Sequence, residues 1–138
     1  MSSNNVVSQE TRIELCEPSD AAQVVVGARR LAAQAGFTET IQFLIATAAS
    51  ELATNIVRYA GRGEVRLSII ENDGRTGFEV AAQDAGPGIA DIDLALKEHY
   101  SSGRSLGLGL PSVKRIMDEF SITSLPGQGT IVVARKWK

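Results

Sequence analysis

The segment SELATNIVRYAG, residues 50–61, lies within a longer stretch whose apolar residues recur at helical spacing. Leu52 and Ile56 continue that spacing, so one face of this helix is expected to pack on a core. Glu51 and Asn55 stand one turn apart along the edge of the same face. Burying a carboxylate and an amide beside a core costs free energy unless each has a partner. The pair is therefore a candidate site, although a solvated helix edge is its simpler interpretation.

The composition is that of one ordinary globular domain. The 138 residues are 43% hydrophobic and 22% charged, which is enough for a core without disulfides. A formal net charge of -2 argues against a dedicated nucleic-acid surface. No apolar run approaches the about 18 residues of a membrane span, and no secretory signal is evident. Cys16 is the only cysteine, so we expect no intramolecular disulfide. Together these features predict a cytoplasmic protein that binds neither nucleic acid nor a membrane.

The order of the predicted elements indicates the fold class. Residues 1–10 are polar and expected to be flexible, and residues 11–138 are expected to form one domain. Because the strands arrive as hairpins and the helices can cover one face, the order predicts a two-layer α+β sandwich. Ser19 or Asp20 is expected to cap the first helix. The predicted elements are a strand at 11–16, helices at about 19–34 and 38–60, strands at 64–71 and 78–84, a helix at about 108–119, and strands at 120–125 and 129–137.

A long loop at residues 84–107, rich in Gly, Ser and Pro, separates the middle hairpin from the next helix. Compact domains rarely carry such loops unless they are functional or disordered. It begins with DAGPG (84–88) and ends with SLGLGL (105–110), where a helix starts. Glycines let a backbone approach a ligand, and a helix N-terminus suits phosphate. The pattern predicts a lid over a nucleotide, although neither GxxxxGK[ST] nor a complete GxGxxG motif occurs.

The order of four motifs is more specific than any one of them. ELATN (51–55), DAGPG, SLGLGL and GQGT (127–130) follow one another over about residues 11–136. In this order the chain resembles the GHKL ATPase and kinase superfamily. That resemblance implies the Bergerat fold, a mixed sheet covered on one face by helices. The short chain, GLPSVKRIMDEFSI (109–122) and the terminal KW make it most similar to the small bacterial serine/threonine kinases of partner-switching pathways, the stressosome switch kinases.

The resemblance implies a site for ATP and Mg²⁺. Asn55 would coordinate Mg²⁺, Asp84 would hydrogen-bond the adenine amino group, and Glu51 would orient or deprotonate the attacking hydroxyl. A carboxylate within hydrogen-bond reach can accept that proton. The other implied nucleotide-binding residues are glycines that approach the ligand and one hydroxyl that supports the adenine contact: Gly86, Gly88, Gly103, Gly107, Gly109 and Thr130.

The resemblance also implies partners. The substrates would be STAS-domain scaffold or antagonist proteins of a stressosome, and the released kinase would bind and activate a PP2C-type phosphatase. An anti-sigma factor kinase of the same superfamily is an alternative, because it shares every nucleotide motif. A non-catalytic nucleotide-sensing adaptor is another, against which the presence of Glu51 beside Asn55 argues.

Overall fold

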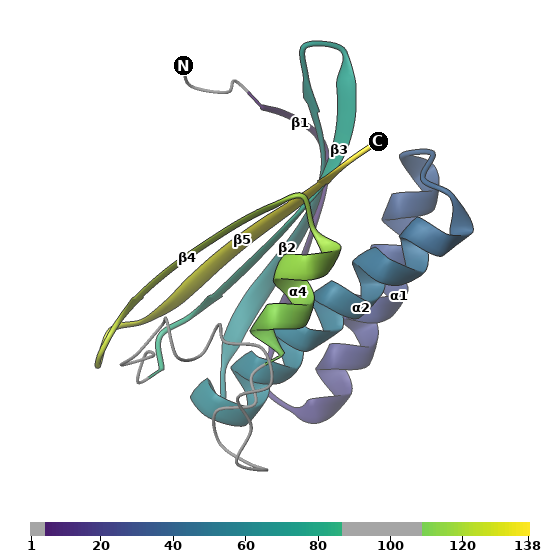
Figure 1. Ribbon diagram of the computed structural model, residues 1–138. Helices are drawn as coiled ribbons and strands as arrows, with labels where there is room; N and C mark the ends of the chain where they lie inside the picture. Colours follow the sequence, from purple (N-terminus) through teal and green to yellow (C-terminus); the bar gives the residue numbers. More distant parts are fainter. Residues whose placement is uncertain (1–4, 87–108) are drawn as a thin grey trace.

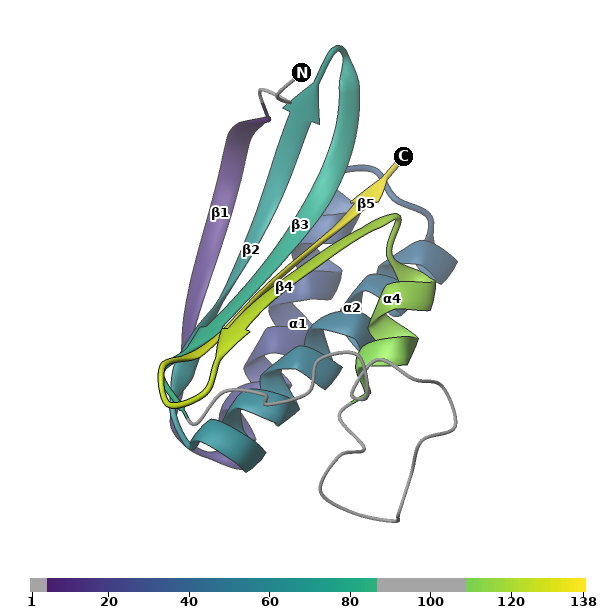
Figure 2. The same ribbon diagram turned by 60° about the vertical axis from the view of Figure 1, so that its left-hand side comes forward.

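A computed structural model describes residues 5–86 and 109–138 as a five-stranded sheet with helices packed on one face (Figures 1 and 2). The strand order is β1-β2-β3-β5-β4. The predicted α+β sandwich is confirmed. All pairings among the described strands are antiparallel, so the expectation of a mixed sheet is wrong in that detail. The elements are β1 (Val6–Leu15), α1 (Pro18–Gln34), α2 (Glu39–Asn55), the π-helix η1 (Ile56–Ala60), β2 (Gly63–Asn72), β3 (Arg75–Asp84), α4 (Leu110–Ile116), β4 (Glu119–Leu125) and β5 (Gly129–Trp137).

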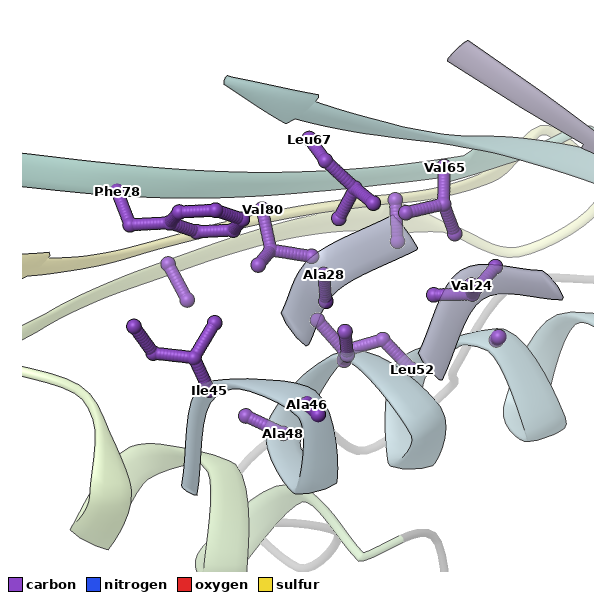
Figure 3. Close-up of a cluster of buried hydrophobic side chains, with 14 of the residues drawn as sticks. Val24, Ala28, Ile45, Ala46, Ala48, Leu52, Val65, Leu67, Phe78 and Val80 are labelled. Atoms are coloured by element: carbon purple, nitrogen blue, oxygen red, sulfur yellow. The ribbon is translucent and has the colours of Figure 1, made fainter. Parts of the chain in front are cut away.

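The core lies between the sheet and the helices. Alternate side chains of β2 and β3 point toward the helices, and Leu67 pairs with Val80 across the two strands. Figure 3 shows Ile45 and Leu52 of α2 pointing toward this surface, and all four side chains are buried. A shift of one residue in either strand would turn these side chains away from the helices. The register of the hairpin is thus fixed by burial.

The continuous helical segment Glu39–Ala60 contains α2 and η1. By length and composition this segment is apolar enough to cross a membrane. However, Ile45, Leu52 and Ile56 are buried in the core beneath the sheet. We therefore attribute its apolar character to packing inside the domain.

β1 begins earlier than predicted. It starts at Val6, which pairs with Glu71 of β2, and a bulge lies between Val7 and Gln9. The strand predicted at 11–16 therefore extends into residues 6–10, which were assigned to the N-terminal segment, so the predicted start is wrong. Their side chains are all exposed, so no alternation of apolar and polar residues reveals the strand. Backbone pairing with β2 places them at the sheet edge instead.

The predicted start of the second helix at residue 38 and the hairpin between the strands predicted at 64–71 and 78–84 are confirmed. Thr38 is the N-cap of α2, because its hydroxyl accepts a hydrogen bond from the N–H of Ile41 at 3.3 Å. The hairpin turn between β2 and β3 has positive φ at both Asp73 (53°) and Gly74 (79°). Such a turn matches the twist of the two strands.

The last described helix is shorter than predicted, since α4 ends at Ile116 rather than near residue 119. Lys136 Nζ donates to the carbonyl of Ile116 at 2.8 Å, and Asp118 accepts from the backbone N–H of Trp137 at 2.8 Å. These bonds direct the chain into β4. The C-terminal Lys-Trp pair therefore fixes the corner between α4 and the sheet.

The start of α1 differs from the prediction in one position. Glu17, not Ser19 or Asp20, is the N-cap, and Asp20 lies at the third helical position. One carboxylate oxygen of Asp20 accepts from the N–H groups of Cys16 at 2.8 Å and Glu17 at 3.0 Å. The hydrogen bond from Cys16 and then that from Glu17 lower the pKa of Asp20.

Replacing Asp20 by Ala should lower the unfolding midpoint at pH 7, because two backbone donors lose their acceptor. The pKa of Asp20 is lowered by folding, so its stabilisation is present above the ordinary value of 3.8 and lost as pH falls through the lower folded value. Thermal unfolding of both proteins between pH 7 and pH 3 measures this, with Ser19→Ala as the control. A destabilisation that is the same at every pH would contradict the assignment.

Candidate functional site

Glu51 and Asn55 lie on the last turns of α2, and both are half-buried. Four residues of an α-helix rise about 6 Å, so the two side chains share one face. The Glu51 carboxylate lies against Gly109 at the start of α4, where any Cβ would overlap with Oε1. Gly109 also has a φ of 73°, which disfavours other residues. Both the close contact with the carboxylate and the backbone conformation therefore require glycine at position 109.

Asp84 is the last residue of β3 and lies between two other strands. It pairs with Gly63 of β2 on one side and with Thr130 of β5 on the other. Its Oδ1 accepts a hydrogen bond from the N–H of Gly86 at 2.8 Å. This bond orients a half-buried carboxylate at the point where the strand ends.

The backbone approaches Asp84 closely from both neighbouring strands. A Cβ on Gly63 would lie 3.1 Å from Asp84 Cβ and 2.8 Å from a methyl carbon of Ile56. A Cβ on Gly129 would collide with the carbonyl oxygen of Asp84, and Gly129 has a φ of 97°. Only glycine allows these approaches. The hydroxyl of Thr130 lies 2.7 Å from that of Ser124, its partner on the adjacent strand β4.

The structure therefore brings the predicted site residues into two groups. Asp84, Gly86 and Thr130 form the first group, at the ends of β3 and β5, and Glu51 and Gly109 form the second. Asn55 lies on the helix between the two groups, directly before Ile56, which packs at Gly63 beside Asp84. The predicted residues Gly88, Gly103 and Gly107 lie outside the described residues.

Sequence reasoning missed the contacts that hold the first group together. Gly63 falls between the predicted helix at 38–60 and the predicted strand at 64–71, whereas in the structure it begins β2 and provides the close approach to Asp84. The π-helix Ile56–Ala60 was also missed, because its apolar residues continue the spacing of α2. Such helices are rare and are often found at functional sites. The position of this π-helix directly after Asn55 is the structural feature that indicates a functional site here.

The donor set can be tested for Mg²⁺. Mg²⁺ is usually held by one or two protein oxygens together with phosphates and waters. The Asn55 amide and the nearby Glu51 carboxylate offer such oxygens on adjacent turns. Within residues 5–86 and 109–138, no group of three or more His, Cys, Asp and Glu side chains is placed to hold a metal alone. The described residues therefore fit an ion held jointly with nucleotide phosphates.

A comparison of the sequence with known protein families identifies the family of this domain. Residues 16–136 match the family model of the histidine kinase-like ATPase domain. The chain belongs to this family. The fold expected from the sequence motifs is that of a histidine kinase-like ATPase domain, and the family description supports the prediction that the chain binds ATP.

Relatives of this ATPase domain indicate its class more closely. The serine/threonine-protein kinase RsbT from Bacillus subtilis is 45% identical over 109 residues, covering 79% of this chain and 82% of the relative. An anti-sigma F factor from Halalkalibacterium halodurans is 32% identical over 120 residues (83% and 81%). Another, from Pasteuria penetrans, is 35% identical over 97 residues (64% and 63%). The resemblance to RsbT-like serine/threonine kinases, and with it the predicted class of enzyme, is confirmed.

Proposed function

We propose that this chain is a Mg-ATP-dependent kinase that phosphorylates serine or threonine on STAS-domain stressosome proteins. The observation that supports this best is the placement of Glu51 and Asn55 on adjacent turns of α2, with the Glu51 carboxylate against Gly109. A carboxylate and a metal-binding amide then lie side by side, with the Asp84 carboxylate held at the end of β3.

The chemistry asks for positioning more than for covalent help from the protein. The acceptor hydroxyl attacks the γ-phosphorus of ATP, the bond to the β-phosphate oxygen breaks, and ADP leaves. Glu51 accepts the proton of the attacking hydroxyl as general base. Its contact with Gly109 limits where the carboxylate can point. In this proposal Glu51 is the catalytic residue.

The nucleotide would be held by both groups of residues. Asp84 would accept a hydrogen bond from the adenine amino group through the carboxylate that Gly86 orients, and Thr130 would support that contact. Asn55 would hold Mg²⁺, which neutralises charge on the phosphates. Gly109, with Gly88, Gly103 and Gly107, would let the backbone approach the nucleotide.

Replacing Asp84 by Asn should weaken ATP binding by about tenfold, because a hydrogen bond to a charged group is worth about 1.5 kcal/mol or more. Equilibrium titration with ATP and GTP measures both affinity and preference for adenine. Gln83→Asn, an exposed neighbour on the opposite face of β3, is the control. Equal binding of ATP and GTP by the wild-type protein would remove the basis of this assignment.

The proposed partners rest on the resemblance to stressosome switch kinases and not on the site. RsbT is named as a serine/threonine-protein kinase. We propose that phosphorylation of a STAS-domain protein releases this chain, which then binds and activates a PP2C-type phosphatase in the cytoplasm. Size-exclusion chromatography of the three purified proteins, with and without Mg-ATP, tests this. Mg-ATP should move the chain from the STAS protein to the phosphatase, and an unchanged distribution would oppose the switch.

An anti-sigma factor kinase is the second candidate, favoured by the relatives named anti-sigma F factor. If the chain captured a purified sigma factor, and continued to do so in the presence of a STAS-domain protein, this candidate would be supported instead. The lower identity of those relatives, 32% and 35% against 45% for RsbT, leads us to place it second. A nucleotide-sensing adaptor would bind ATP without transferring phosphate.

A further inference from the structure

Ala60, the last residue of the π-helix η1, lies directly against Gly86 in the turn after β3. A Cβ built on Gly86 would be 2.5 Å from Ala60 Cβ and 2.8 Å from Ala60 Cα. Carbon atoms that are not bonded do not approach so closely, so the contact leaves no room for a side chain at position 86. The segment that follows Asn55 therefore rests on the turn that follows Asp84.

This contact bears on the Asp84 carboxylate through one hydrogen bond. The N–H of Gly86 donates to Asp84 Oδ1 at 2.8 Å, so displacement of Gly86 moves or breaks the bond that orients the carboxylate. The other end of η1 is fixed as well: the N–H of Gly61 donates to the carbonyl of Ile56 at 2.8 Å, and Ile56 packs at Gly63. We therefore expect a shift of Ala60 to displace Gly86, which it contacts directly.

We propose that Ala60 is a positioning residue that sets the preference for adenine by holding Gly86, and through it the Asp84 carboxylate, in place. The inference rests on the proposed nucleotide site and extends it to a residue outside the sequence motifs. The proposal predicts that the size of the side chain at position 60 affects nucleotide binding. We expect a larger side chain at position 60 to crowd the Gly86 turn, and a glycine there to remove the nearer of the two Ala60 carbons that a Cβ at position 86 would meet.

The first test is a pair of compensating substitutions. Gly86→Ala should weaken ATP binding by about tenfold, the loss expected when the bond that orients a charged acceptor is broken. Ala60→Gly alone should change binding little. Ala60→Gly with Gly86→Ala should recover part of the lost affinity, because the nearer of the two Ala60 carbons is gone while the Cα, 2.8 Å from the added Cβ, remains. Titration with a fluorescent ATP analogue, with unlabelled GTP as competitor, measures this. Additive losses in the double variant would overturn the inference.

The second test separates positioning from general destabilisation. Ala60→Val should raise KM for ATP about tenfold, reduce the preference for ATP over GTP and leave kcat nearly unchanged. Ala33→Val, the same change at an exposed position of α1, is the control. A fall in kcat with unchanged KM and unchanged preference would indicate a smaller folded fraction and would overturn the inference.

The two proposals can fail separately. If the wild-type protein binds ATP but transfers no phosphate, the kinase proposal fails, and the binding measurements with the compensating pair still decide the role of Ala60. If the wild-type protein transfers phosphate and the compensating pair shows no rescue, the role of Ala60 fails alone.

Discussion

Replacing Glu51 by Gln should lower the rate of phosphate transfer by about 10²–10⁴-fold, the usual contribution of a positioned general base. Glutamine keeps the shape and can still lie against Gly109, but its amide cannot accept the proton of the attacking hydroxyl. Affinity for ATP should change little, because the other nucleotide contacts remain. Single-turnover transfer from labelled ATP and equilibrium titration of the same protein measure the two quantities.

Glu39→Gln is the matched control for that prediction. Glu39 lies in the first turn of the same helix and is exposed, so the same change there should leave transfer intact. Transfer by Glu51→Gln at the wild-type rate would remove Glu51 from the chemistry. A loss of ATP affinity equal to the loss of rate would show instead that Glu51 holds the nucleotide or the metal.

Replacing Asn55 by Ala should abolish Mg²⁺-dependent ATP binding. Removal of a residue that only supports a metal ligand lowers metal affinity by about 10–100-fold. Asn55 is proposed as a direct ligand, so the loss of Mg²⁺-dependent affinity should be at least as large. Isothermal titration with ATP in Mg²⁺ and in EDTA measures the metal-dependent part of the affinity. The variant and the wild-type protein should bind alike in EDTA and differ only with Mg²⁺.

Thr54→Ala is the control for Asn55, since Thr54 is a half-buried neighbour in the same turn. Its Mg²⁺-dependent binding should match that of the wild-type protein. If Asn55→Ala kept its Mg²⁺-dependent affinity, the metal assignment would be wrong, and the ion would have to be held by other oxygens.

The fold was predictable where burial is periodic. α2 has buried residues at helical spacing. The β2–β3 hairpin was predictable from two strand-like segments joined by Asp73 and Gly74, which form its turn. The start of β1 was not predictable, because residues 6–10 are exposed and show no alternation. The π-helix was not predictable either, because its apolar residues continue the helical spacing of α2 and do not mark a change of helix type. Local pattern therefore identifies elements, while pairing and helix type depend on the neighbouring elements.

The candidate site was predictable as a set of motifs and not as a set of contacts. Glu51, Asn55 and Asp84 stand in recognisable motifs of the sequence. The fit of Gly129 to the carbonyl of Asp84 and that of Gly86 to Ala60 join segments far apart in the chain. No local pattern encodes such contacts, because they exist only once the strands and helices have packed.

The measurement that tests the central claim most directly is phosphate transfer to a protein substrate. The purified chain is incubated with labelled Mg-ATP and a STAS-domain stressosome protein, and the products are mapped by mass spectrometry, with EDTA and Glu51→Gln as controls. The account predicts one phosphate on a serine or threonine of the STAS protein, absent from both controls. ATP bound at normal affinity with no phosphate transferred to the STAS protein would contradict the proposed kinase and favour a nucleotide-sensing adaptor.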